Sequence, residues 1–355
     1  MKALGYARSI FNTKWMTRDY LTNGWLFFIR EEALTIFILS VIMWVIDTVT
    51  GRDTCCKLLH LVLIVLIRRV MVGGICNSTK RLDGQTVVIT GCNVGIGKET
   101  ARALSQRGAK IIMACRNTKT AEKTALEISN VTGRELVVMK LDLASLSSIR
   151  AFAADLKKKE SKIHILINNA GVMMCPFMKT EDGFEMQMGT NHLGHFLLTN
   201  LLLPLLSHGQ PARIINVSSL ASARGVIPFD DMNYEKGYNK VQAYGNSKLA
   251  NVLFTRQLAK RLKGTSIQVF ALHPGAVQSN LGRHFMGMWS ASKLVTLFIK
   301  TTAEGAQTTI FCALEACQQE PHYFSDCAPG YVVSAAQDDE VAEKLWKVSE
   351  KMVGL

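Results

Sequence analysis

Short apolar runs rich in β-branched residues recur along the chain after residue 83, and stretches of helix length separate them. Each run has the length of a strand that is buried on both faces, and alternation with helices is typical of a parallel sheet. The pattern predicts a doubly wound α/β fold of Rossmann type over residues 82–355. The predicted strands cover residues 85–90, 110–114, 136–140, 164–167, 213–217 and 267–272.

The first 81 residues have a different, more apolar pattern. Residues 33–49 form a run whose one charge is Asp47, and the run just reaches the length that a bilayer span requires. A second apolar run, residues 58–75, is interrupted by two adjacent arginines, so we expect it to lie at the membrane interface. We predict a membrane-anchoring region with one transmembrane helix. A second span and a buried core helix are the alternatives.

The charge distribution supports a membrane as partner. The chain has a formal net charge of +13, and residues 1–81 hold 11 basic and 5 acidic side chains, a local excess of +6. Basic residues beside apolar segments indicate a membrane surface, and the chain has no basic tract interleaved with aromatic residues. We therefore expect no nucleic acid partner. The basic flanks of residues 33–49 lean weakly toward a cytosolic C-terminal domain.

Nine cysteines are scattered through the chain without any Cys-x-x-Cys pair, which predicts free thiols in a reducing compartment. Cys55 and Cys56 lie between the two apolar runs, and their S-acylation is left open. His192 and His195 have no further ligand cluster at metal-binding spacing. We therefore predict no metal site and expect both histidines to pack near the active-site helix.

A glycine-rich turn follows the first predicted strand. It reads Thr90-Gly91-Cys92-Asn93-Val94-Gly95-Ile96-Gly97, and a predicted helix runs from Lys98 to Gly108. Glycines at such a turn let the backbone approach a pyrophosphate, whose charge then lies at the amino terminus of the helix. The strand before the turn and the helix after it favour a dinucleotide-binding site over a plain turn.

The end of the second predicted strand distinguishes between the two nicotinamide cofactors. An NAD site usually places a carboxylate there, but this chain has Cys115 followed by Arg116. A guanidinium suits a 2′-phosphate, so the sequence favours NADP(H), with Lys98 as a second cation. An ordinary solvated arginine is the alternative.

Tyr244 and Lys248 are four residues apart in a predicted helix that runs to about Leu262. At this spacing the two side chains share one helix face, so the ammonium can stabilise a phenolate and lower the tyrosine pKa. The pattern gains weight from Ser218-Ser219, Asn168-Asn169-Ala170-Gly171 and Asn191, which follow strand ends where an open α/β sheet binds its ligands.

Together these motifs resemble the short-chain dehydrogenase/reductase family over about residues 83–350. The phrases TGCNVGIGKETA, LINNAGVM, TEDGFEMQMGTNHLGHFLLTNLLL, NSKLANVLFTRQLAKRL, HPG and YFSD are similar to its membrane-anchored retinol dehydrogenase (retinal reductase) branch. Cys92 departs from that branch, which commonly has alanine there. The resemblance implies NADP(H) preference, reduction of retinal and other lipid aldehydes, and placement in the endoplasmic reticulum membrane or, alternatively, a mitochondrial membrane.

The resemblance also assigns roles to residues. Tyr244 would be the general acid-base, Lys248 would bind the nicotinamide ribose, and Ser219, 25 residues before Tyr244, would hold the substrate oxygen. Asn191 would anchor a water in the proton relay, and Asp142 would bond the adenine amino group. The remaining cofactor contacts would come from Gly91, Asn93, Gly95, Ile96, Gly97, Arg116, Asn169, Ala170, Gly171, Pro274 and Gly275.

An apolar segment after the sixth predicted strand is expected to form a substrate lid for a long hydrophobic ligand, and a helix packed on the core is the alternative. Its large side chains are Phe285, Met286, Met288, Trp289, Leu294, Leu297 and Phe298. The expected partners are an apolar small molecule and a membrane, and a homo-oligomer is left open. A steroid or other lipid alcohol dehydrogenase and a non-catalytic membrane scaffold are the competing functions.

Overall fold

The computed structural model describes residues 43, 45–46, 48–51, 62, 64–66, 68–278, 281, 299–317 and 322–355. The chain divides into two compact units, Met1–Met71 and Val72–Leu355. Cys55, Cys56, most of the apolar run at 33–49 and the large side chains of the predicted lid lie outside the described residues. The anchoring region, its boundary near residue 81 and the lid therefore stay predictions. Within the described part, no helix combines the length and the apolar character that a membrane span requires.

The second unit is built on a sheet with the strand order β3-β2-β1-β4-β5-β6-β7-β8. The strands from β3 to β7 are parallel, and β8 pairs antiparallel with β7. All six predicted strands are confirmed within about one residue, but the sequence interpretation missed β7 and β8. The bounds are β1 Thr86–Thr90, β2 Lys110–Cys115, β3 Val137–Lys140, β4 Ile165–Asn168, β5 Ala212–Val217, β6 Ile267–His273, β7 Tyr323–Ser325 and β8 Ala328–Pro329.

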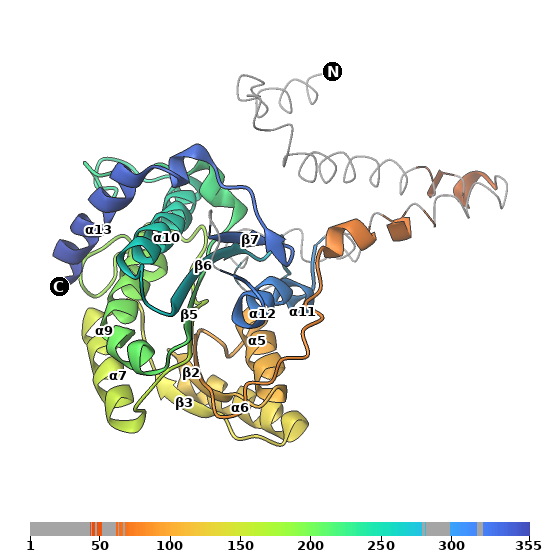
Figure 1. The fold of residues 1–355 in the computed structure, drawn as a ribbon. Coiled ribbons are helices and arrows are strands. Elements are labelled where there is room, and N and C mark those ends of the chain that lie inside the picture. The colour runs from red at the N-terminus through yellow and green to blue at the C-terminus, as the bar shows by residue number, and fades with distance from the viewer. Residues whose placement is uncertain are drawn as a thin grey trace. The chain divides into compact units, whose positions relative to one another are not determined.

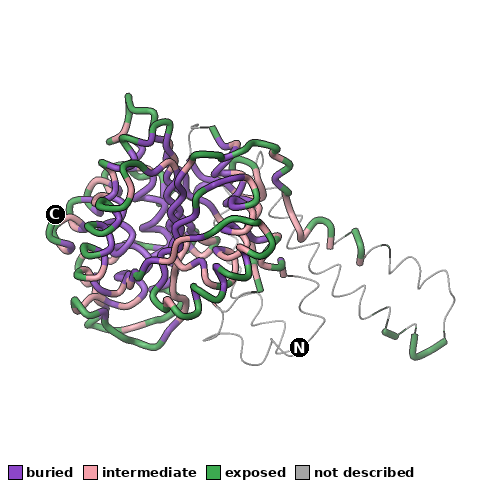
Figure 2. The backbone as a smooth tube through the Cα atoms, turned by 90° about the horizontal axis from the view of Figure 1, so that it is seen from below, coloured by how far each residue is buried: buried purple, intermediate pink, exposed green. Residues whose placement is uncertain are grey.

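Helices cover both faces of this sheet (Figure 1). On one face α5 (Gly95–Gln106), α6 (Thr118–Thr132) and α12 (Gln307–Leu314) pack on side chains such as Ile89 and Phe270. On the other face α7 (Leu146–Lys159), α9 (Gly194–His208) and α10 (Lys240–Arg261) pack on side chains such as Val88 and Val269. Alternate residues of each strand thus serve opposite faces, which is why the strands read as continuous apolar runs. Figure 2 shows the resulting buried interior.

Several short turns and helices and the C-terminal helix α13 complete the unit. They are α8 Met186–Met188, a π-helical turn Gly189–Leu193, a 3₁₀ turn Leu220–Arg224, α11 Thr302–Gly305, a 3₁₀ turn Ser334–Ala336 and α13 Asp339–Val353. Helix α10 begins four residues before Tyr244, because Asn239 caps it by accepting hydrogen bonds from the N–H groups of Val241 and Gln242. The tyrosine that the sequence predicts to be catalytic therefore lies in the second turn of a helix whose amino terminus is capped.

The order of the strands changes direction between β1 and β4. The chain runs outward from β1 to β3, returns to β4 on the other side of β1 and continues outward to β6. Val88 of β1 is paired with Ile112 on one side and with Leu166 on the other. The carboxyl ends of β1 and β4 thus lie at the point where the winding reverses, which is where sheets of this kind bind their ligands.

Candidate active site

The predicted site residues gather at the carboxyl edge of the sheet. Asn169, which follows β4, donates from Nδ2 to the carbonyl of Thr90 at 2.9 Å and to the carbonyl of Gly91 at 3.2 Å, both at the end of β1. Lys248 of α10 donates from Nζ to the carbonyl of Val217, the last residue of β5, at 3.0 Å. The glycine turn, the Asn169 segment and α10 are therefore joined at one edge by hydrogen bonds.

The glycine turn after β1 needs its glycines for shape and for space. Gly91 (φ +62°) and Gly95 (φ +64°) have the left-handed conformation that glycine adopts without strain. A Cβ on Gly97 would lie 2.6 Å from Nδ2 of Asn169 and 2.8 Å from the Cα of Cys92. The start of α5 thus fits closely against the ends of β1 and β4, and Asn93 and Ile96 lie half-buried in the same turn.

Helix α5 presents an uncapped amino terminus at this turn. Its N-cap, Val94, has no side-chain acceptor, whereas α6, α7, α10 and α13 are capped by the side chains of Asn117, Ser145, Asn239 and Asp338. The N–H groups of a first helical turn bind anions, and the helix dipole adds to the attraction. These residues therefore fit the pyrophosphate of a dinucleotide cofactor.

The adenosine end of the expected cofactor site lies after β2 and β3. Arg116 is exposed directly after Cys115, the last residue of β2. The ammonium of Lys98, which we expect to be a second cation at this site, pairs with Glu127 at 2.5 Å, and its role toward the cofactor stays a prediction. Asp142 follows β3 and is half-buried, and its Oδ1 accepts a hydrogen bond from the N–H of Ala144 at 3.0 Å. Arg116 is thus exposed directly after β2, where the sequence predicts that a 2′-phosphate binds.

The predicted catalytic residues meet between α10 and the end of β5. Nζ of Lys248 lies 5.8 Å from the centroid of the Tyr244 ring, as their spacing on one helix face predicts. The hydroxyl of Ser219 lies near the Tyr244 phenol and lowers its pKa. The hydroxyl of Ser218 instead donates to the carbonyl of Lys248 at 2.8 Å and holds α10 against β5. Ser219 is therefore the serine of the pair that lies with the phenol.

Burial controls the ionisation of Tyr244 and Lys248. Tyr244 and Lys248 are only 4% and 3% exposed. Burial raises the pKa of Tyr244, and the nearby hydroxyl of Ser219 opposes that shift. Burial lowers the pKa of Lys248 to about 8. The expectation of a lowered tyrosine pKa is thus wrong, because the loss of solvation outweighs the stabilisation of a phenolate.

Asn191 lies in the π-helical turn before α9 and is fully buried. Its side chain accepts from the N–H of Val172 at 2.8 Å and donates to the carbonyl of Val172 at 3.0 Å and to the Ser247 hydroxyl at 2.9 Å. π-helical turns often occur at functional sites, but the sequence pattern did not predict this one. It also missed Glu185, whose carboxylate accepts from the N–H groups of Gln187 and Met188 and so anchors the turn.

The remaining predicted contacts lie beside β6. Pro274 and Gly275 follow the strand, and Gly275 has φ +90°. A Cβ on Gly275 would lie 2.8 Å from the side chain of Lys300, which pairs through Nζ with Asp326 at 2.6 Å. Lys300 also forms a bridge with Val277, so the two ends of the predicted lid segment are joined at their base.

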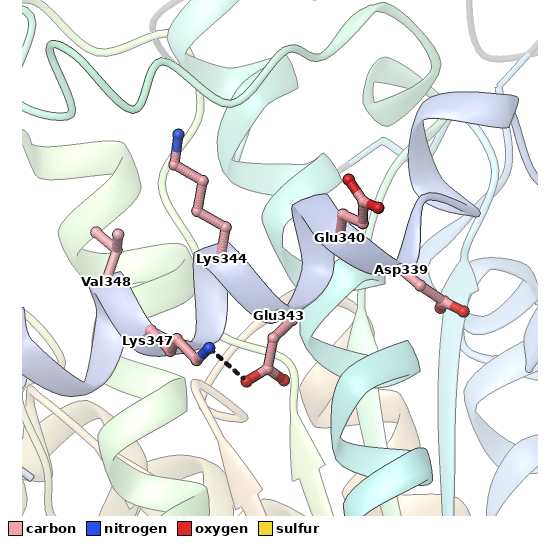
Figure 3. A pocket seen from close by; sticks show the side chains of 6 residues that line it. All are labelled: Asp339, Glu340, Glu343, Lys344, Lys347 and Val348. Atoms are coloured by element: carbon pink, nitrogen blue, oxygen red, sulfur yellow. Dashed lines mark ion pairs between the residues drawn. The ribbon is translucent and has the colours of Figure 1, made fainter.

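A surface hollow on α13 contains none of these residues. It is lined by Asp339, Glu340, Glu343, Lys344, Lys347 and Val348 of that single helix (Figure 3). Exposed charged side chains dominate it, and Lys347 pairs with Glu343 at 3.4 Å. The hollow is therefore an ordinary solvated helix face.

The comparison with curated proteins finds relatives over most of the chain. Human retinol dehydrogenase 12 is 51% identical over 293 residues, which cover 81% of this chain and 92% of the relative. Human retinol dehydrogenase 11 is 50% identical over 292 residues with the same coverage. Human retinol dehydrogenase 14 is 49% identical over 294 residues, covering 77% of this chain and 88% of the relative.

Solved structures show the same fold. An uncharacterised protein from Mycobacterium Paratuberculosis aligns with a TM-score of 0.65 and 37% identity, covering 79% of this chain and 98% of that one. The Pseudomonas aeruginosa RhlG/NADP active-site complex aligns with a TM-score of 0.56 and 28% identity, covering 68% of this chain and 94% of that one.

The family model described as short chain dehydrogenase matches residues 85–288, which include the glycine turn, Asn191, Ser219, Tyr244 and Lys248. The match spans more than half of the chain, and the relatives named above extend it toward both ends. The chain therefore belongs to the short-chain dehydrogenase/reductase family and, within it, to the branch that contains these retinol dehydrogenases.

Proposed function

We propose that the protein is an NADP(H)-dependent oxidoreductase that interconverts retinal and retinol, or related apolar aldehydes and alcohols, and works mainly as a reductase. The observation that carries the proposal is the Ser219, Tyr244 and Lys248 arrangement beside the glycine turn, in a chain about half identical to proteins named retinol dehydrogenase. All three side chains lie at the sheet edge where an α/β fold binds nucleotides and substrates.

The proposed mechanism assigns each side chain one task. The nicotinamide, when bound, supplies the hydride to the carbonyl carbon. Ser219 holds the carbonyl oxygen by a hydrogen bond, and the phenol of Tyr244 transfers its proton to that oxygen. Because burial raises the pKa of Tyr244, the phenol is protonated at neutral pH, which is the form that reduction consumes. Lys248 binds the ribose, and Asn191 orders the water that returns a proton to the tyrosine.

The preference for NADP(H) is proposed from Arg116. Its exposed guanidinium follows β2, where a carboxylate would repel a 2′-phosphate and bind the ribose of NAD instead. A structural relative that is 28% identical is described as an NADP complex, which supports the assignment. The amino terminus of α5, with Gly91, Gly95 and Gly97 before and within its first turn, would hold the pyrophosphate.

The proposal also assigns the protein to a membrane, that of the endoplasmic reticulum, with residues 1–81 as the anchor and the catalytic domain in the cytosol. Asn77 and Asn130 lie in N-x-Ser/Thr sequons, and both are exposed. A glycan on either asparagine, detected as a mobility shift removed by an endoglycosidase, would show that the catalytic domain faces the lumen.

The experiment that tests the function uses the full chain in detergent or vesicles, with all-trans-retinal and either NADPH or NADH. NADPH consumption that matches retinol formation is expected, and Tyr244→Phe should reduce kcat by about 10²–10⁴-fold, the usual contribution of a general acid. Tyr238→Phe, which removes a hydroxyl bonded to Glu185 and Gln187, is the matched control. A wild-type protein that turns over no apolar carbonyl with either cofactor would contradict the proposal.

A further inference from the structure

His195 is a buried histidine that the proposed mechanism does not use. It lies in the first turn of α9, directly after the π-helical turn that holds Asn191, and is 2% exposed. Both ring nitrogens are engaged. Nδ1 lies 3.0 Å from the backbone carbonyl of Asn191, and Nε2 lies 2.9 Å from the hydroxyl of Thr90 at the end of β1.

The partners determine where the hydrogens lie. A carbonyl oxygen only accepts, so Nδ1 of His195 carries the ring proton. Burial lowers the pKa of His195 to about 4, so the ring is neutral at physiological pH and Nε2 is an acceptor. The hydroxyl of Thr90 therefore donates to Nε2. Its other acceptor in reach, the carbonyl of Ile167, lies farther away at 3.5 Å.

The oxygen of Thr90 is used on its other side by the segment that follows β4. It accepts hydrogen bonds from the N–H groups of Asn169 and Ala170, each at 2.9 Å. One donated and two accepted bonds exhaust the capacity of a hydroxyl. Thr90 can hold this segment with both lone pairs because its own proton goes to His195, its nearer acceptor.

The far end of the same segment is held by the other partner of His195. The side chain of Asn191 accepts from the N–H of Val172 and donates to its carbonyl. Thr90, residues 169–172, Asn191 and His195 thus form a closed ring of hydrogen bonds. Within the ring, a Cβ on Gly171 would lie only 3.0 Å from Oδ1 of Asn191 and 3.6 Å from Nζ of Lys248. A shift of the segment would therefore disturb Asn191 and Lys248 together.

We propose that His195 is a positioning residue that ties the relay residue Asn191 to Thr90 and so sets residues 169–172 in place for the nicotinamide end of the cofactor. The inference rests on the proposed function, because it assumes that this segment borders the bound cofactor. Few side chains could replace the imidazole here, since the site needs a donor toward Asn191 and an acceptor toward Thr90 on one short, rigid ring.

His192 supplies the contrast. It is equally buried and lies three residues earlier in the chain, but its Nε2 bonds the hydroxyl of Ser349 on α13 at 2.8 Å. Its ring packs beside Phe196 and Phe254. Loss of this imidazole should cost stability without breaking the ring around residues 169–172, so His192→Phe is a matched control for His195→Phe.

The test is a double-mutant cycle on NADPH affinity, measured by the fluorescence of the bound cofactor with the full chain. His195→Phe and Thr90→Val each leave a buried polar partner unsatisfied, and each should weaken binding by roughly 5- to 50-fold. Because both break the same ring, the double variant should bind within about twofold of the weaker single variant. The pair Thr90→Val and His192→Phe should instead give independent effects that multiply.

Conservative variants and melting temperatures distinguish a positioning role of His195 from a role in stability alone. Thr90→Ser keeps the hydroxyl and His195→Gln keeps an acceptor toward Thr90, so both should recover most of the affinity that Thr90→Val and His195→Phe lose. Affinities that follow Tm alone across all variants, His192→Phe included, would overturn the inference. So would independent effects of His195→Phe and Thr90→Val. A wild type that binds neither NADPH nor NADH would instead refute the proposed function, and this inference with it.

Discussion

The two ends of the proposed cofactor site are built in opposite ways. At the nicotinamide end, Asn191, Lys248 and Tyr244 are at most 4% exposed, and hydrogen bonds within the chain hold Asn191 and Lys248. At the adenosine end, Arg116 is exposed and Lys98 is paired with Glu127 at the surface. Side chains that catalysis requires to be placed within fractions of an ångström are held in place by burial. Exposed, mobile charged side chains are sufficient to bind a phosphate.

The largest effect is expected at the buried end. Lys248→Met removes the ammonium that lies by the Tyr244 ring, so kcat/KM for retinal reduction should fall by about 10²–10⁴-fold in a steady-state assay. Lys240→Met, an exposed lysine in the first turn of the same helix, should leave kcat/KM within about twofold. Equal losses in both variants would show that the buried ammonium has no special part in the chemistry.

The exposed end should affect the choice of cofactor and not the chemistry. Arg116→Ala should weaken NADPH binding by about 10- to 100-fold, the value of a charge-assisted hydrogen bond, and should change NADH binding by less than about threefold. Titration of cofactor fluorescence measures both affinities. Lys119→Ala, an exposed lysine three residues later, serves as the control. If Arg116→Ala weakened the binding of NADPH and NADH equally, the proposed 2′-phosphate contact would be wrong.

The pH dependence of cofactor binding tests the buried lysine. Below about pH 8 Lys248 carries its charge, and above its lowered pKa of about 8 it becomes neutral. NADPH affinity should therefore decline above pH 8, by at most about tenfold per pH unit. Tyr244 does not interfere in this range, because burial raises its pKa. Lys248→Met should abolish the dependence, and an unchanged wild-type affinity from pH 7 to 10 would contradict the assignment.

The smallest effect is expected at Cys92. Its buried thiol lies 3.9 Å from the thiol of Cys115 and donates to the carbonyl of Ile89 at 3.2 Å. Cys92→Ala removes one sulfur beneath the glycine turn, so NADPH affinity should stay within about twofold and Tm should fall by a few degrees at most. Gly97→Ala is the contrasting variant, because its Cβ would collide with the backbone at Cys92. A large effect of Cys92→Ala would mean that the thiol takes part in cofactor binding.

Most of the fold could be predicted because its signals are local. Six strands were visible as β-branched runs, and the pairing of Tyr244 with Lys248 follows from the geometry of a single helix. Strands β7 and β8 were missed because Tyr323–Ser325 and Ala328–Pro329 are too short to show a pattern. The choice of Ser219 over Ser218 came from resemblance, and the contacts of the two hydroxyls add a physical reason to it.

The sequence by itself determined which residues could do the chemistry and on which elements they lie, because helix and strand periodicity depend on neighbours in the chain. Only the tertiary structure decided how those residues are charged and held. The raised pKa of Tyr244 results from burial by distant segments, and the His195 to Thr90 hydrogen bond spans 105 positions of the chain. Desolvation and long-range hydrogen bonds exist only once the sheet and its helices have packed.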